Sequence, residues 1–179
     1  MTSTSKFALF FTVYAALAAS STAFAQNTGK VECTILENAS AASGTIELKG
    51  SDGELISGSC GGPVSAPAGK YSVELRLDGA LDHPKKTSTV EVKSGETSQL
   101  KADFSTGILQ IQAQEGERRV AAMATVYRGS SRVGSLGMGV TAHLSTGSYD
   151  VVVRYRSKEK RFSGVTLSAQ QKRVLNAAF

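Results

Sequence analysis

The sequence has no tryptophan, only two cysteines, three prolines and two histidines among its 179 residues. It also lacks the G-x-S-x-G nucleophile motif and the H-E-x-x-H zinc motif. His83 lies in a predicted turn and His143 in a short predicted strand, and neither has a histidine or cysteine neighbour that could share a metal or a proton. We therefore predict a non-enzymatic protein with no catalytic residues, no cofactor and no metal site.

Long apolar runs are also lacking, except at the N-terminus. Lys6 precedes a mostly apolar run from Phe7 to Ala19, and Ala23-Phe24-Ala25 fits a small-x-small cleavage site. The run is short for a membrane span, which takes about 20 residues. We predict that residues 1–25 are a signal peptide and that the protein is exported to the periplasm or the outside of a bacterial cell. An uncleaved N-terminal anchor is the alternative.

The rest of the sequence contains an approximate internal repeat. Residues 28–31 (TGKV) match residues 106–109 (TGIL), and residues 68–73 (AGKYSV) match residues 146–151 (TGSYDV), both at an offset of 78 (106 − 28). The halves close on Phe104 and Phe179. A repeat of this length indicates a duplicated domain rather than a solenoid unit. We predict a first domain at residues 26–104 and a second at residues 105–179.

The two cysteines, Cys33 and Cys60, can pair in only one way. Export would place them in an oxidising compartment. At the repeat offset they align with the apolar residues Ile111 and Met138, which suggests two core positions that touch. We predict a structural disulfide worth about 3–4 kcal/mol on the chain-entropy model. Two buried thiols or a redox pair are the alternatives, although a redox pair usually has C-x-x-C spacing.

Short alternating runs bounded by Gly, Ser, Asn and Asp fill both halves, and no window shows a helical period. The expected strands are residues 30–35, 45–49, 55–59, 71–77, 87–92 and 97–104, then 108–112, 122–128, 132–136, 140–144, 149–155, 161–167 and 172–179. Six or seven short strands in about 75 residues are typical of a small sandwich. We predict an all-β fold, with two tandem small antiparallel β-sandwich domains after the signal peptide.

A glycine followed two residues later by a tyrosine recurs before one strand of each half. Gly69 precedes Tyr71, and Gly147 precedes Tyr149. The glycine permits a positive φ at the end of a turn. The tyrosine can bury its ring and still offer its hydroxyl to a backbone partner. We therefore predict structural roles for both tyrosines.

These motifs carry a family resemblance. Ala124-Thr125-Val126-Tyr127 gives a v-x-v-y strand, Leu144 to Val153 reads L-x-x-G-x-Y-x-v-x-v, and Ala66 to Val73 stands at the latter place in the first half. The chain resembles PEGA-like and transthyretin-like (carboxypeptidase-regulatory-like) bacterial β-sandwich modules, in two tandem copies. The resemblance implies a non-catalytic part of an envelope or cell-surface protein, by analogy of fold.

Charge separates the two halves. Residues 26–104 hold 8 Lys+Arg and 11 Asp+Glu, a net of −3, whereas residues 105–179 hold 11 and 4, a net of +7. Positive residues gather in a predicted strand–turn–strand tip, at Arg154, Arg156, Lys158, Lys160 and Arg161. This run is either a solvated hairpin or a contact for an anionic partner.

We therefore predict an exported binding or scaffolding protein that contacts an envelope protein, an anionic lipid or an acidic glycan through the basic tip. We do not expect nucleic acid as the partner. Head-to-tail self-association of the acidic half with the basic half is the alternative. A small outer-membrane barrel, suggested by the terminal Phe179, is a further one.

Overall fold

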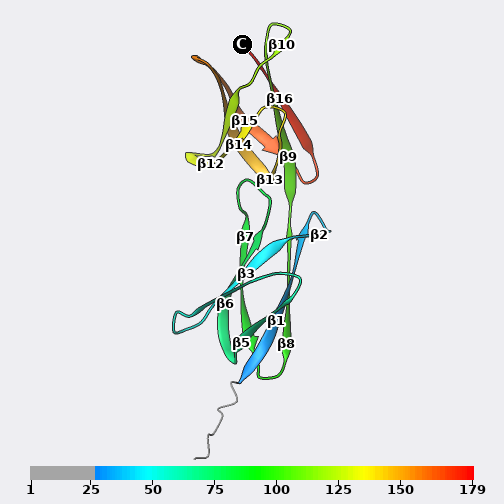
Figure 1. Ribbon diagram of the computed structural model, residues 1–179, viewed down its shortest axis with the longest axis vertical. Helices are drawn as coiled ribbons and strands as arrows, with labels where there is room; N and C mark the ends of the chain where they lie inside the picture. The colour runs from blue at the N-terminus through cyan, green and yellow to red at the C-terminus, as the bar shows by residue number, and fades with distance from the viewer. Residues whose placement is uncertain (1–26) are drawn as a thin grey trace, which may run out of the picture.

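The computed structural model describes residues 27–179, so the predicted signal peptide lies outside the described residues. Residues 27–179 form strands and turns with no helix, and therefore no helix that could cross a membrane. They fold into two sandwich-like domains placed end to end in an elongated molecule (Figure 1). The predicted all-β fold and tandem sandwiches are confirmed.

The first sandwich consists of two four-stranded sheets. Its strands are β1 (Thr28–Glu37), β2 (Ser40–Ala42), β3 (Gly44–Lys49), β4 (Leu55–Ser59), β5 (Pro63–Pro67), β6 (Gly69–Leu77), β7 (Lys85–Val92) and β8 (Thr97–Phe104). In one sheet, β1 pairs antiparallel with β2 and β5 along one edge and parallel with β8 along the other. The other sheet has the order β4-β3-β6-β7 and is antiparallel throughout.

The second sandwich repeats this order strand for strand. Its strands are β9 (Thr106–Glu115), β10 (Arg118–Arg119), β11 (Met123–Arg128), β12 (Ser131–Gly137), β13 (Thr141–Ser145), β14 (Gly147–Tyr155), β15 (Lys158–Leu167) and β16 (Lys172–Ala178). β9 takes the place of β1, with β10 and β13 on one edge and the parallel β16 on the other. The second sheet has the order β12-β11-β14-β15. One parallel pair in each unit is the departure from the antiparallel pattern predicted.

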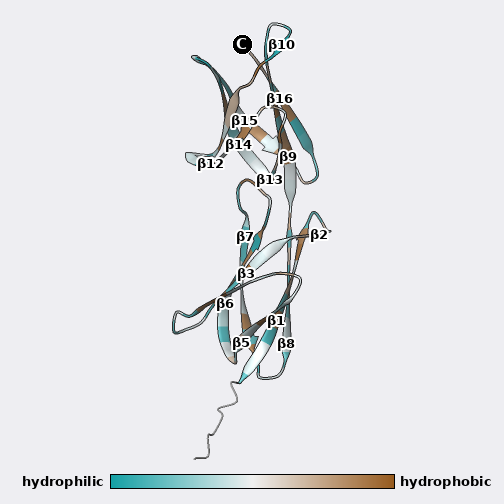
Figure 2. Ribbon diagram, viewed as in Figure 1, coloured by the Kyte–Doolittle hydropathy of each residue, from teal (hydrophilic) through white to brown (hydrophobic). Residues whose placement is uncertain are grey.

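Each sandwich encloses its own hydrophobic core between its two sheets (Figure 2). Side chains alternate between the two faces of a strand, so every second residue of the central strands points into the core. In the first core Val31, Leu48 and Val73 are almost fully buried, and in the second Val126 and Val151 are. The two cores are separate clusters, and the chain passes from one sandwich to the other through the short connection between β8 and β9.

Cys33 on β1 and Cys60 after β4 form the predicted disulfide, with an S–S distance of 2.05 Å. The bond joins the two sheets of the first sandwich. Gly61 N–H donates to the carbonyl oxygen of Cys33 at 3.0 Å, and at the repeat offset Gly139 N–H donates to that of Ile111 at 2.8 Å. The second sandwich therefore makes the same backbone contact without a covalent bond.

Candidate functional site

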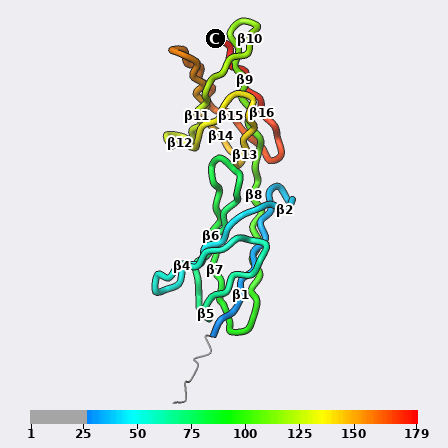
Figure 3. Tube along the Cα trace, in the orientation of Figure 1, coloured from blue at the N-terminus to red at the C-terminus, as the bar shows by residue number. Residues whose placement is uncertain are grey.

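The basic run folds as a hairpin at the end of the molecule that lies away from residue 27 (Figure 3). It comprises the end of β14, a two-residue turn at Arg156 and Ser157, and the start of β15. The predicted strand–turn–strand segment is therefore present. Arg156 has a positive φ of 52° and its guanidinium lies 5.0 Å from the centre of the Tyr155 ring.

Two glutamates partly neutralise this hairpin. Arg154 Nε lies 2.9 Å from Glu159 Oε2, and Lys158 Nζ lies 3.0 Å from Glu115 Oε1. The hydrogen bond from Lys158 outweighs burial and lowers the pKa of the Glu115 carboxyl. The Arg154 and Lys158 side chains remain 59% and 52% exposed. Ion pairs this exposed contribute little stability, so the cations remain open to a partner.

The hairpin divides its cations between two faces. Because side chains alternate along a strand, Arg154 and Arg161 lie on the outward face of the β12-β11-β14-β15 sheet. Lys158 and Lys160 lie on the opposite face, which continues the core side, and Lys158 accordingly reaches Glu115 on β9. The five residues predicted as one surface thus form an outward pair, a core-side pair and the turn residue Arg156.

The outward face of β12-β11-β14-β15 includes residues that the basic run alone does not reveal. Met123 pairs with Arg154, and Tyr127 pairs with Arg132 on β12. Met123 is 54% exposed, whereas Val152 is 1% exposed although it points outward, because neighbouring side chains cover it. The period-two pattern of β11 and β12 would have been the signal for these residues. We name Arg132, Arg154 and Arg161 the arginine face.

The corresponding face of the first sandwich has different chemistry. There Glu47 on β3 lies opposite Glu74 on β6, and Thr87 follows on β7. By the repeat, Glu74 occupies the place of Val152, and Thr87 occupies that of Arg161. On this face Arg76 and Lys85 both pair with Glu74, at 2.5 and 2.7 Å, so the Glu74 carboxylate is neutralised by neighbouring cations.

The two sandwiches meet through a buried carboxylate. Asp82 lies on the loop between β6 and β7 of the first sandwich and contacts residues of the second. Its side chain is 7% exposed. Its oxygens accept from Ser145 N–H at 3.1 and 3.2 Å and lie 3.3 Å from the Tyr149 hydroxyl. Arg128 Nη2 lies 3.5 Å from the same carboxylate. Figure 1 shows this loop reaching the second sandwich beside β13.

A second polar group completes the junction. Glu37 Oε1 accepts from the Thr106 hydroxyl at 2.5 Å and lies 2.7 Å from His143 Nδ1. Burial alone would raise the pKa of Glu37, but the hydrogen bonds from Thr106 and His143 lower it. His143 is therefore hydrogen-bonded, as expected, and His83 is exposed on the β6–β7 loop. Among residues 27–179, no three His, Cys, Asp or Glu side chains are grouped to hold a metal ion.

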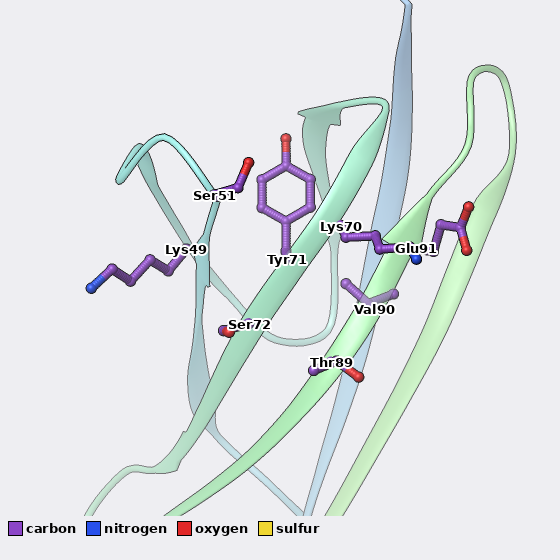
Figure 4. A pocket seen from close by; sticks show the side chains of 9 residues that line it. Lys49, Ser51, Lys70, Tyr71, Ser72, Thr89, Val90 and Glu91 are labelled. Atoms are coloured by element: carbon purple, nitrogen blue, oxygen red, sulfur yellow. The ribbon is translucent and has the colours of Figure 1, made fainter.

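An open depression of about 600 Å³ lies on the first sandwich beside Tyr71. Gly50, Ser51 and residues of β6 and β7 line it, including Lys70 and Glu91 (Figure 4). The Tyr71 hydroxyl donates to the Pro67 carbonyl at 2.9 Å, and its ring is buried, as predicted. The depression lies at the end of the first sandwich that is opposite the junction with the second.

No family model matches the chain. No curated protein matches it either. Among solved structures, a putative adhesin from Bacteroides ovatus is 10% identical, with a TM-score of 0.45, over 83% of this chain and 88% of that one. A minor pilin of the Gram-positive pathogen Streptococcus agalactiae is 10% identical, with a TM-score of 0.42, over 85% and 94%.

The Bacillus anthracis TIE protein is 17% identical, with a TM-score of 0.36, over 85% of this chain. The chain spans 34% of the length of that protein. It spans 26% of the length of a leucine-rich repeat protein from Bacteroides thetaiotaomicron that it also matches. At this level of similarity, these structures assign the chain neither a family nor a function.

Proposed function

We propose that this chain is an exported, non-catalytic binding or scaffolding protein of the bacterial envelope, and that its second domain contacts an anionic partner through the basic hairpin. The observation that carries the proposal is the concentration of exposed cations there. Five cationic side chains between Arg154 and Arg161 meet only two paired carboxylates, Glu115 and Glu159, which leaves a local balance of +3 (5 − 2).

The arginine face, which joins Arg154 and Arg161 of the hairpin to Arg132 of β12, is the better contact surface. Arg154 lies opposite Met123, and Arg132 lies opposite Tyr127, and this mixture of Arg, Met and aromatic residues is enriched in interfaces. Arginine also binds carboxylate, phosphate and sulfate groups through two parallel hydrogen bonds. The partner is an acidic envelope protein, an anionic lipid or an acidic glycan.

The short motifs around Tyr71 and Tyr149 support placing both units among PEGA-like or transthyretin-like modules. The predicted signal peptide at residues 1–25 supports a periplasmic or extracellular location. In this proposal the first domain, at residues 26–104, acts as a disulfide-stiffened spacer. The second, at residues 105–179, acts as the contact domain.

The proposal is tested with the double variant Arg154→Glu/Arg161→Glu and a matched control, Lys172→Glu/Arg173→Glu. The control makes the same charge change on exposed residues of β16, in the other sheet. Binding is measured against anionic vesicles, an acidic polysaccharide and native envelope extract, at low and moderate salt. We expect the double variant to lose about tenfold or more in affinity with an unchanged melting temperature, and the control to lose much less. Equal losses would make the arginine face an ordinary solvated surface.

A further inference from the structure

In the second sandwich an arginine lies beside the buried tyrosine of the repeat, Tyr149. The Arg128 guanidinium lies 4.7 Å from the centre of the Tyr149 ring and also donates to the Tyr149 hydroxyl. At the repeat offset, Gly50 takes the place of Arg128 and Tyr71 that of Tyr149. A glycine there leaves the depression beside Tyr71 open (Figure 4). The first sandwich therefore lacks a cation that its duplicate has.

The site in the second sandwich is completed by a loop of its neighbour. Asp82 lies on the β6–β7 loop, at the end of the first sandwich that faces the second. In the second sandwich the corresponding connection is the β14–β15 turn, at the equivalent end of its domain. That turn presents Arg156, whose side chain is 68% exposed. The β14–β15 turn corresponds to the loop that makes the internal contact, and the depression beside Tyr71 corresponds to the site that receives it. Neither has such a contact among residues 27–179 of one copy.

The depression has carboxylates that a cation could contact, together with two lysines. Asp52 Oδ1 accepts from Glu54 N–H at 3.0 Å and would lie 2.7 Å from a Cβ added at Gly50. Burial, and then the negative charges of Glu54 and Asp52, raise the pKa of the Tyr71 hydroxyl. Glu91 also lines the depression, together with Lys49 and Lys70. Figure 4 shows Lys49 extending away from the Tyr71 ring. An arriving guanidinium would meet the 6% of Tyr71 that is exposed and the carboxylates of Asp52 and Glu91 near it, with which it can form charge-assisted hydrogen bonds.

A further contact distinguishes the Tyr149 site from the depression beside Tyr71. In the internal junction, Leu81 packs against Gly134, where an added Cβ would lie 2.6 Å from Leu81 Cδ1. Ile56 occupies the corresponding position of the first sandwich. A loop that carries Leu81 would therefore meet the Ile56 side chain there, whereas the β14–β15 turn consists of only Arg156 and Ser157.

We propose that the β14–β15 turn of one copy docks beside Tyr71 of a second copy, with Arg156 taking the position that Arg128 fills in the second sandwich. Donor and acceptor are different surfaces, so the contact is heterologous and builds open head-to-tail chains. Arg156 gives up an exposed 4.0 Å ion pair with Glu115 and its contact with the Tyr155 ring, both of which are weak at an exposed site. This proposal does not rest on the proposed function, because it uses the turn and not the arginine face.

The test is sedimentation velocity of the exported, purified protein over a range of concentrations at low and high salt. The wild-type protein is expected to form salt-sensitive, concentration-dependent chains. Arg156→Glu removes the donor, and Gly50→Arg fills the acceptor within its own chain. There the added Cβ displaces Asp52 Oδ1, which lies 2.7 Å away, and meets the Tyr71 ring at an ordinary 3.6 Å. Each variant alone is expected to remain monomeric.

A mixture of the two variants tests whether the turn and the depression bind each other. Arg156→Glu keeps its acceptor and Gly50→Arg keeps its donor, so the mixture is expected to form one-to-one dimers that grow no further. Arg154→Glu, two residues from the turn, is the matched control and should associate like the wild type. A monomeric wild-type protein, a monomeric mixture, or undiminished association of Gly50→Arg would each overturn the proposal. Loss of anionic-partner binding by Arg154→Glu/Arg161→Glu with intact self-association would separate the two proposals.

Discussion

Two tyrosines occupy the same place in the duplicated units and have acquired different surroundings. Tyr71 donates its hydroxyl to the Pro67 carbonyl at 2.9 Å, and Tyr149 donates to the Ser145 carbonyl at 2.7 Å. Only the Tyr149 hydroxyl also contacts a charged group, since Asp82 and Arg128 both reach it. At the scale of one residue, a structural hydrogen bond has become part of the contact between domains.

This difference predicts unequal effects of removing the two hydroxyl groups. Tyr149→Phe should lower the free energy of unfolding by about 2–3 kcal/mol, because a buried charged network loses a member. Tyr71→Phe should cost about 1 kcal/mol, since it loses one neutral hydrogen bond. Urea unfolding of both variants at neutral pH measures the two values. Equal losses would mean that the contact of Tyr149 with Asp82 adds nothing.

Alkaline pH gives an independent check on the same residue. Burial, and then the charge of Asp82, raises the pKa of Tyr149 from 10.0 to about 12. A pKa that is higher in the folded state stabilises the fold below pH 10, and this stabilisation is lost as the pH rises towards 12. Tyr149→Phe should therefore lose less stability over this interval than the wild type. An identical decline in both proteins would contradict the assignment.

At the scale of the strand, local pattern predicts some elements and not others. The alternation in residues 71–77 predicts β6, which in the structure begins two residues earlier, at Gly69. β2 and β10 have only three and two residues, too few to show a period. Pro63 and Pro67 bound β5, which pairs with β1 at the edge of its sheet, where a missing backbone N–H is tolerated. The parallel pairing of β1 with β8 has no local signature, because it depends on how the whole unit closes.

The disulfide joins the two sheets of the first sandwich, whereas the second sandwich has apolar residues at the equivalent positions. A variant without the disulfide can therefore carry the residues of the second sandwich. Cys33→Ala/Cys60→Ala should destabilise the first sandwich by about 3–4 kcal/mol, since the unfolded chain regains the entropy of a loop with a sequence separation of 27. Cys33→Ile/Cys60→Met copies the second sandwich and should lose less, because it restores apolar contact. Thermal unfolding of both variants against the wild type measures the difference. No loss on mutation to alanine would show that the core alone holds these strands.

At the scale of the whole molecule, sequence locates charge but not the junction. The basic hairpin could be predicted because its residues are contiguous from Arg154 to Arg161. Asp82 and Ser145 are 63 residues apart, and Glu37 and His143 are 106 apart. Nothing in either segment indicates that they meet, because their contact depends on the relative orientation of two domains. The division of the hairpin cations between two faces likewise depends on the strand register and not on the run itself.

The junction itself predicts how the molecule unfolds. Asp82 accepts from Ser145 N–H, contacts the Tyr149 hydroxyl and pairs with Arg128. Asp82→Ala therefore leaves Ser145 N–H without its acceptor and Arg128 without its carboxylate partner. We expect a loss of about 2–3 kcal/mol and, because the domains then unfold independently, two transitions in place of one. Differential scanning calorimetry separates the transitions, and small-angle scattering should show a less fixed elongated shape. Asp78→Ala, at an exposed position of the same loop, removes the same charge without touching the second sandwich and should leave a single transition. If both variants unfold alike, the angle between the domains is set by the short β8–β9 connection and not by the buried carboxylate.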